Sequence, residues 1–151
     1  MGEAAMNDTH QYTVVVGVDG SPSSKTALRW AAWHAEQLGG TLAALMSWDL
    51  PLIYSWEVPD SEDIARRTAA GLDEVIAEAL ADKPDLAVSK NIASGHPARA
   101  LLDLAEETGA DMIALGNRGQ GGFAEALLGS VSQHVVHHAR CPVVIVRDGG
   151  R

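Results

Sequence analysis

The chain has 151 residues, of which 46% are hydrophobic and 21% charged, and its formal net charge is -9. This balance suits a single globular domain with a sizeable core and excludes an intrinsically disordered chain. The negative charge argues against a broad surface that binds DNA or RNA, although backbone N–H groups can still bind phosphate in an acidic protein. No apolar run approaches the length needed to cross a membrane.

The first strand and helix can be read from the N-terminal quarter of the chain. The opening MGEAAMNDTH lacks the basic and apolar segments of a signal peptide, so residues 1–11 are expected to form a loose, disordered tail. Residues 12–18, YTVVVGV, predict a buried strand. Ser21 and Pro22 then favour a helix N-cap and first position, and a Gly-Gly pair at 39–40 predicts the end of that helix.

The middle of the chain repeats this order. Residues 41–48, TLAALMSW, predict a second strand because they follow the glycine stop, and the two prolines within 49–60 predict a loop. Helical spacing of apolar residues resumes at Ser61 and stops before Pro84. Residues 86–93 alternate with polar side chains, which indicates a strand near a sheet edge.

The last third adds two helices and two strands. Pro97 opens a helix that Gly109 closes, and residues 111–115, DMIAL, predict a buried strand. A glycine-rich segment then leads to a helix that begins at a Gly-Ser pair at 129–130. Residues 142–146, PVVIV, predict the last strand.

Strands and helices therefore alternate along one domain, expected at 12–147 with a short C-terminal tail at 148–151. Alternation at this spacing predicts an α/β fold, an open parallel sheet with helices on both faces. Ligands of such sheets bind at the carboxyl ends of the strands, where the strand order reverses. The ends of the first and fourth strands, at Asp19 and Gly116, are therefore the candidate site.

The segment LGNRGQGG at 115–122 has four glycines in eight residues and directly follows the fourth strand. It is not a Walker A loop, because that motif requires a lysine and none lies between Gly116 and Ser130. The first strand does not lead into a G-x-G-x-x-G dinucleotide fingerprint either, since VDGS follows it. The plainest alternative is a surface turn.

The pattern that is present reads Gly116-Asn-Arg-Gly119, nine residues, then Gly129-Ser130. Glycines at 116 and 119 let the backbone approach a ligand closely. The pair at 129–130 begins a helix, whose unpaired N–H groups attract anions. Arg118 supplies the nearby positive charge, so the segment has the chemistry of a phosphate-binding loop.

The spacing G-x-x-G-x9-G-[ST] after the fourth strand resembles the nucleotide-binding motif of the universal stress protein family. The segments VVVGVDGSPSSKTALRWA, GHPARALLDLAEETGADMIALGNRG and LLGSVSQHVVHHARCPVVIVR resemble other parts of that family, so the resemblance covers about residues 12–147. It implies a five-stranded sheet in the order 3-2-1-4-5 and bound ATP, with or without Mg²⁺. At most, slow ATP hydrolysis or autophosphorylation is expected, because the sequence offers no general base at this site besides Asp19.

The resemblance also implies a role for each matching position. Asp19, with Gly17 and Val18 beside it, would hold the ribose and border the adenine, and Ser47 would meet the adenine edge through its backbone. The phosphate contacts would come from Gly116, Arg118, Gly119, Gly129 and Ser130, with first-turn contacts from Val131 and Ser132. The alternative for Asp19 is that it caps the first helix.

Three functions stay open at this stage. The first is a regulatory protein in which ATP binding orders the glycine-rich loop and alters a surface that partners bind. The second is a cyclic AMP-binding protein that uses the same pocket, and the third is a nucleotide-free dimeric interaction protein. An adenylyl-transferring enzyme would need a motif such as S-G-G-x-D-S after the first strand, which VDGS does not supply.

Partners and location follow from a few further residues. The apolar strand at 142–146 is expected at a sheet edge, where it would pair with a second copy, and the resemblance also implies a homodimer through this strand. Cys141 is the single cysteine, which fits a reducing cytoplasm. His134 and His138 have the spacing of paired zinc ligands, but without a third ligand nearby they are interpreted as surface residues.

Overall fold

A computed structural model describes residues 10–49, 60–117 and 128–147. Most of the expected N-terminal tail, the loop predicted within 49–60 apart from its ends, Arg118, Gly119 and the tail at 148–151 lie outside these residues. Within the described ranges, no helix has both the length and the apolar character needed to cross a membrane.

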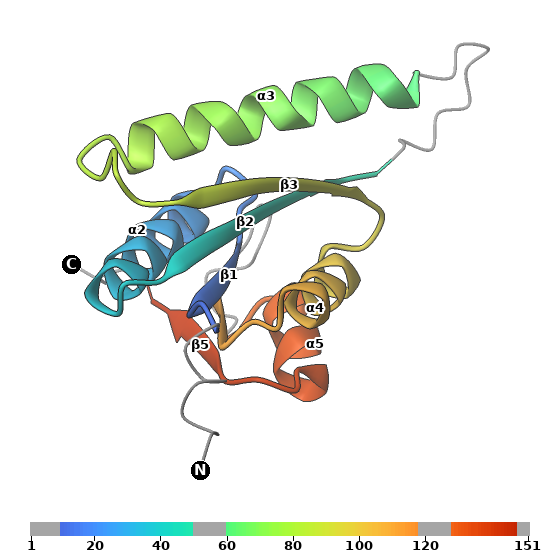
Figure 1. The fold of residues 1–151 in the computed structure, drawn as a ribbon. Coiled ribbons are helices and arrows are strands. Elements are labelled where there is room, and N and C mark those ends of the chain that lie inside the picture. The colour runs from blue at the N-terminus through green and yellow to red at the C-terminus, as the bar shows by residue number, and fades with distance from the viewer. Residues whose placement is uncertain (1–9, 50–59, 118–127, 148–151) are drawn as a thin grey trace.

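Five parallel strands form one sheet in the order β3-β2-β1-β4-β5 (Figure 1). The strands are β1 (Thr13–Gly17), β2 (Thr41–Trp48), β3 (Val88–Ser94), β4 (Met112–Gly116) and β5 (Val143–Val146). On the central strand, Val16 pairs with Ala44 of β2 on one side and with Ala114 of β4 on the other. The strand order therefore reverses between β1 and β4, which confirms the predicted sheet and its order.

Two helices cover each face of the sheet. The helices are α2 (Pro22–Gln37), α3 (Ser61–Ala79), α4 (Pro97–Thr108) and α5 (Ser130–His138), with α2 and α3 on one face and α4 and α5 on the other (Figure 1). Ser21 is the N-cap of α2, as predicted, and its Oγ accepts the Ser24 N–H at 3.2 Å. Gly109 ends α4 with a φ of 62°, a conformation that suits glycine.

Strand β1 separates two hydrophobic cores. Val14 and Val16 pack with α2 and α3, whereas Val15 packs with α4 and α5, and all three valines are completely buried. Because successive side chains of a strand point to opposite faces, a strand covered on both faces shows no polar alternation. This explains why three consecutive valines, Val14, Val15 and Val16, form the centre of β1.

All strands but β2 differ from their predicted bounds by one or two residues, and for β3 and β4 the contacts of the structure give a local reason. The third strand was predicted at 86–93 but begins at Val88, because the Leu86 N–H donates to the Lys83 carbonyl in a turn. The fourth strand was predicted at 111–115 and runs one residue later, at Met112–Gly116. Asp111, the residue before it, is hydrogen-bonded to Thr13 through both its backbone and its side chain. Its backbone N–H donates to the Thr13 carbonyl at 2.9 Å, and its carboxylate accepts the Thr13 N–H at 2.9 Å.

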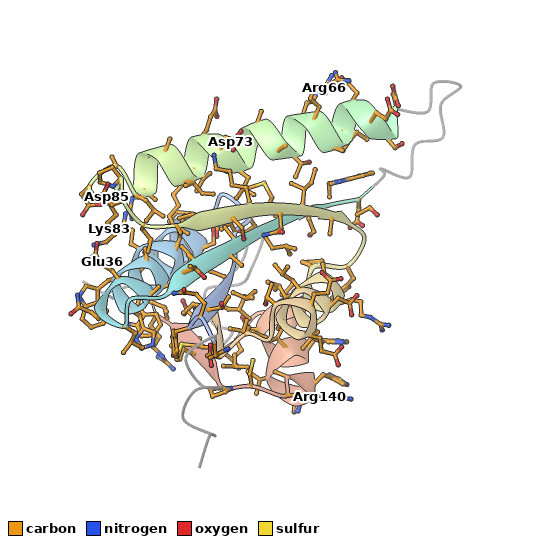
Figure 2. The ribbon with its side chains drawn as sticks, viewed as in Figure 1. Glu36, Arg66, Asp73, Lys83, Asp85 and Arg140 are labelled. Atoms are coloured by element: carbon orange, nitrogen blue, oxygen red, sulfur yellow. The ribbon has the colours of Figure 1, made fainter. Side chains whose placement is uncertain are left out.

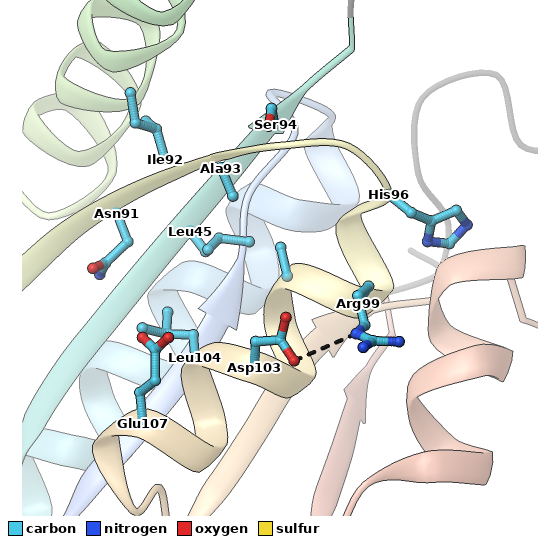
Figure 3. Close-up of a pocket in the computed structure, with 11 residues that line it drawn as sticks. Leu45, Asn91, Ile92, Ala93, Ser94, His96, Arg99, Asp103, Leu104 and Glu107 are labelled. Carbon is cyan, nitrogen blue, oxygen red and sulfur yellow. Dashed lines mark ion pairs between the residues drawn. The ribbon is translucent and has the colours of Figure 1, made fainter.

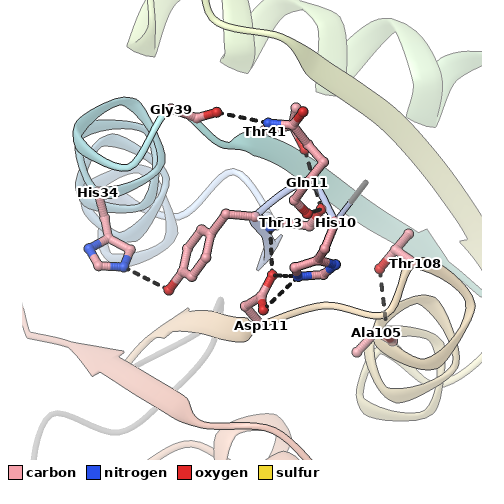
Figure 4. Close-up of polar contacts among 10 residues, drawn as sticks. His10, Gln11, Thr13, His34, Gly39, Thr41, Ala105, Thr108 and Asp111 are labelled. Atoms are coloured by element: carbon pink, nitrogen blue, oxygen red, sulfur yellow. Dashed lines mark hydrogen bonds and ion pairs between the residues drawn. The ribbon is translucent and has the colours of Figure 1, made fainter. Parts of the chain in front are cut away.

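Polar contacts tie the start of β1 to its neighbours (Figure 4). His10 Nε2 lies 2.9 Å from both carboxylate oxygens of Asp111, and Gln11 Nε2 donates to the Gly39 carbonyl at 2.8 Å. Both residues belong to the expected tail, yet both are hydrogen-bonded. Burial raises the pKa of Asp111, but the Thr13 N–H and His10 outweigh it and the pKa is lowered overall.

Ion pairs lie on the outside of the helices. Lys83 Nζ, in the turn after α3, lies 2.9 Å from Glu36 Oε1 at the end of α2 (Figure 2). Arg140, after α5, lies 3.2 Å from Glu106 of α4. These pairs join neighbouring helices at the surface, where such contacts contribute little to stability.

Candidate functional site

The residues predicted to bind a ligand from the first two strands lie at the carboxyl end of the sheet. Gly17 is the last residue of β1, and Val18 and Asp19 follow it. The Val18 N–H donates to the Leu45 carbonyl at 2.8 Å, so the chain still follows β2 as it leaves β1. Ser47 lies two residues beyond Leu45 on β2. The parallel strands therefore bring these residues together at the carboxyl end of the sheet.

Asp19 shapes the turn between β1 and α2. Its Oδ1 accepts the Ser21 N–H at 2.9 Å, and its own N–H donates to Ser24 Oγ at 3.2 Å. The N-cap of α2 is Ser21, so the alternative in which Asp19 is itself the cap is wrong. Asp19 is exposed, and its backbone and carboxylate are held at the carboxyl end of β1.

The glycines that end β1 and β4 are closely packed inside the protein, Gly17 against leucine side chains and Gly116 against the backbone of α2. A Cβ added at Gly17 would lie 2.9 Å from Leu115 Cδ2, and one added at Gly116 would lie 2.7 Å from the Ser23 carbonyl oxygen and 2.8 Å from its carbonyl carbon. Neither glycine has a positive φ. Close approach of a ligand was the predicted reason for a glycine at 116, and in the structure the first turn of α2 is itself a neighbour that leaves no room for a Cβ there.

The start of α5 returns to the end of β4. The Gly129 N–H donates to the Asn117 carbonyl at 3.1 Å, and Ser132 Oγ donates to the Gly116 carbonyl at 3.0 Å. Ser132 is buried, with 5% of its surface exposed. Two of the predicted phosphate-binding groups are therefore already bonded within the protein, and they hold α5 against the end of β4.

The remaining groups at the start of α5 have the chemistry of an anion site. Gly129 is the N-cap and has no side chain to accept a hydrogen bond. Among the described residues, no acceptor bonds the backbone N–H groups of Ser130, Val131 or Ser132. Such N–H groups carry the positive end of the helix dipole and favour negative charge. Ser130 is exposed, so a ligand can reach this turn.

Two polar residues that the sequence analysis did not select also join the site. Ser23, in the first turn of α2, donates through Oγ to Oδ1 of Asn117, the residue after β4, at 3.1 Å. In the sequence, Asn117 occupies a variable position of the glycine motif, and Ser23 lies near the helix N-cap at Ser21, so neither was assigned a ligand contact. The available signal was their position: Asn117 directly follows β4, and Ser23 lies in the first turn of the helix that follows β1.

A separate cavity of about 300 Å³ opens between β2, β3 and α4 (Figure 3). Leu45 and Leu104 line its apolar side, and Arg99 and Asp103, which form an ion pair at 3.5 Å, line its polar side. None of the predicted ligand residues that the structure describes lines this cavity. It is therefore distinct from the site between β1 and β4.

Three histidines, one at the N-cap of α4 and two in α5, lie together on the surface. The ring of His134 is stacked on that of His138, with centroids 4.4 Å apart, and lies 5.6 Å from that of His96. His96 Nδ1 accepts the Ala98 N–H at the start of α4, and His138 Nδ1 contacts the His134 carbonyl. In the part of the chain that the structure describes, no group of three side chains is arranged to hold a metal ion.

The histidine cluster predicts a pH effect on stability. Desolvation lowers the pKa of His134, and the positive charges of His138, His96, Arg99 and His137 lower it further. The folded protein then binds protons at His134 less readily than the unfolded chain, so stability falls as the pH drops below about 6.5, the ordinary histidine value. We expect His134→Asn to reduce the loss of thermal stability between pH 7.5 and pH 5. Unfolding curves with the same pH dependence in both proteins would contradict this.

Comparison with known proteins gives a consistent result. The model of the universal stress protein family matches residues 12–147. A universal stress protein from Mycolicibacterium smegmatis is 35% identical over 144 residues, which cover 90% of this chain and 48% of that protein. The chain thus spans about half the length of the curated relatives it matches.

Two solved structures have the same fold. A crystal structure of a universal stress protein in complex with cAMP has a TM-score of 0.70 and 29% identity, and the match covers 92% of this chain and 98% of that one. The universal stress protein UspA from Lactobacillus plantarum has a TM-score of 0.74 and 24% identity, with coverage of 92% and 100%.

Proposed function

The chain belongs to the universal stress protein family, and from that premise we propose that it binds an adenine nucleotide at the carboxyl ends of β1 and β4. The observation that carries the proposal is the first turn of α5, whose N–H groups have no acceptor among the described residues. It lies where the strand order reverses, the usual ligand position in such sheets. The relative that was solved with cAMP supports the adenine part of the proposal.

The proposed contacts follow the positions of the residues. Asp19 would hold the ribose, and Gly17, Val18 and Ser47 would border the adenine. Ser130 and Val131 would donate to the phosphates through their backbone, while Gly129 and Ser132 would act by holding α5 in place. Arg118 and Gly119, which lie outside the described residues, are part of the same proposal.

ATP is the proposed ligand, and cyclic AMP is the second candidate. Several N–H donors together with the charge of Arg118 suit a polyphosphate, whereas cyclic AMP offers a single charged phosphate. The relative in complex with cAMP is the observation that favours the second candidate. If neither ligand binds, the remaining candidate function is that of a dimeric interaction protein without a nucleotide.

A regulatory function fits these residues better than catalysis. Among the described residues that follow β1 or β4, Asp19 is the carboxylate nearest the strand ends, and its Oδ1 accepts the Ser21 N–H. Among the described residues, no group of three or more His, Cys, Asp or Glu side chains could hold a metal ion, so Mg²⁺ at this site would depend on the phosphates of ATP for ligands. We propose a cytoplasmic regulatory protein, formed by one domain over 12–147, that hydrolyses ATP slowly if at all and uses neither nucleic acid nor membrane as a partner.

Calorimetric titration of the nucleotide-free protein with ATP, ADP, cyclic AMP and adenosine tests the proposal. Saturable heat from ATP, with tighter binding than adenosine, is the expected result. A clear preference for cyclic AMP would replace ATP as the ligand of the same site. No heat from any of the four compounds, with the protein folded by circular dichroism, would overturn nucleotide binding.

We also propose that the chain forms a homodimer through residues 142–146. Strand β5 lies at the edge of the sheet, and its four apolar residues are only half-buried in the single chain. An apolar edge strand of this kind favours pairing with another copy.

The edge-strand dimer predicts the effect of a charge on β5. Val144→Lys is expected to shift the protein to monomer in sedimentation velocity, because a lysine on an edge strand disfavours pairing. Ser89→Lys on β3, at the opposite edge of the sheet, is the matched control and is expected to leave the dimer intact. An unchanged dimer in Val144→Lys would contradict pairing through β5.

A further inference from the structure

A partly buried hydrogen bond joins the first turn of α2 to the residue that follows β4 in the proposed site. Ser23 Oγ donates to Asn117 Oδ1 at 3.1 Å, and Ser23 is 3% exposed. Ser23 belongs to α2, which follows β1, whereas Asn117 follows β4. The contact therefore spans the point where the strand order reverses.

The backbone on both sides of Asn117 is also fixed. Its carbonyl accepts the Gly129 N–H at 3.1 Å, and the preceding carbonyl, of Gly116, accepts from Ser132 Oγ at 3.0 Å. Asn117 is thus held by the end of β4, by the first turn of α2 and by the N-cap of α5. A side chain held in this way can present its remaining polar atoms in one orientation.

The remaining polar atoms of Asn117 are hydrogen-bond donors. A side-chain amide has one acceptor oxygen and one NH₂ group with two donors, and Ser23 occupies the oxygen. Among the described residues, no acceptor bonds Nδ2 of Asn117. An amide whose oxygen is engaged offers N–H groups alone, and this arrangement suits an anion.

We propose that Asn117 binds a phosphate of the nucleotide through Nδ2 and that Ser23 is the positioning residue that fixes the amide orientation. The inference rests on the proposed function, because it assigns a further residue to the same site. Without the Ser23 hydroxyl the amide can rotate and turn its oxygen toward the phosphate. Ser23 would therefore favour phosphate-bearing ligands over the nucleoside alone.

The test is a set of calorimetric titrations with ATP and with adenosine on Asn117→Ala, Ser23→Ala and the double variant. Asn117→Ala is expected to weaken ATP binding about tenfold or more, as for the loss of a hydrogen bond to a charged group, and Ser23→Ala about threefold. The double variant should bind ATP no more weakly than Asn117→Ala, because Ser23 acts through Asn117. Adenosine affinity should stay unchanged in all three.

A control separates this role from a general effect on α2. Thr26→Ala removes another hydroxyl of α2, one that bonds the Pro22 carbonyl within the helix, and it should change neither affinity. Thermal unfolding of every variant shows whether it is folded at the titration temperature. If Ser23→Ala does not fold, Asn117→Ala alone decides the assignment of Asn117.

The outcomes distinguish this inference from the proposed function. If Asn117→Ala has the same ratio of ATP affinity to adenosine affinity as the wild type, Asn117 does not contact the phosphate. The proposal that the protein binds a nucleotide would be unaffected by that result. A further loss of ATP affinity on adding Ser23→Ala to Asn117→Ala would overturn the positioning role of Ser23. A wild-type protein that binds neither compound would overturn both proposals.

Discussion

Replacing Gly116 with alanine is expected to lower the free energy of unfolding by about 1–3 kcal/mol, the usual range for overpacking. The added Cβ would lie 2.7 Å from the Ser23 carbonyl oxygen and 2.8 Å from its carbonyl carbon. Both atoms belong to the backbone of α2, so relief requires the helix to shift rather than a side chain to rotate. Chemical denaturation of the variant and the wild type measures the difference.

Gly71→Ala is the matched control, because it makes the same chemical change within α3. There an added Cβ meets only Met46 Sδ, at 3.9 Å, which is ordinary van der Waals contact. Alanine also restricts the unfolded chain and favours the helix, so this variant should gain about 0.4–1 kcal/mol. Equal stability of Gly116→Ala and wild type would show that the contact with Ser23 does not restrict position 116.

This result bears on how the site is tested. A bulky residue at Gly116, such as valine, would disturb the packing of α2 on β4 as well as any ligand. Loss of nucleotide binding in such a variant would therefore not identify a phosphate contact. Substitutions at exposed positions of the site are more informative.

Ser130→Asp is expected to weaken ATP binding about tenfold or more while the fold is kept or slightly stabilised. A carboxylate in the first turn of α5 interacts favourably with the helix dipole, by about 0.3–1 kcal/mol, so folding gains. The same charge would repel a phosphate bound to the N–H groups of that turn. Opposite effects on stability and on affinity are a signature that general damage to the protein cannot produce.

The measurement combines thermal unfolding with calorimetric titration of ATP and adenosine. Ser130→Asn is the control, since it has nearly the size of aspartate without the charge, and it should bind ATP more tightly than Ser130→Asp. Adenosine should bind both variants equally. ATP binding to Ser130→Asp at wild-type affinity would place the phosphates away from the start of α5.

Most of the fold could be predicted from the sequence because its signals are local. Ser21 and Pro22 mark the start of α2, and Gly109 marks the end of α4, through backbone preferences that act within a few residues. The apolar run of β1 predicts burial on both faces. Strand ends were less accurate, because Asp111 and Leu86 are held by contacts that local patterns do not contain.

The site could be predicted only in part, for the opposite reason. The glycine spacing indicated where a phosphate could bind, but the bond between Ser23 and Asn117 depends on how α2 packs against β4. The same packing explains Gly116, whose role could not be separated from that of a ligand-binding glycine by sequence. Contacts between residues far apart in the chain therefore decide the details of this site.

The central place of β1 also has a consequence during synthesis of the chain. Val14 pairs with Leu42 soon after it is made, but its other neighbour, Met112, emerges from the ribosome only after most of the domain. Until then one edge of an apolar strand stays without its partner, and such edges promote association between nascent chains. The order of the strands thus makes the interval before β4 is translated the time when this protein is most exposed to misassembly.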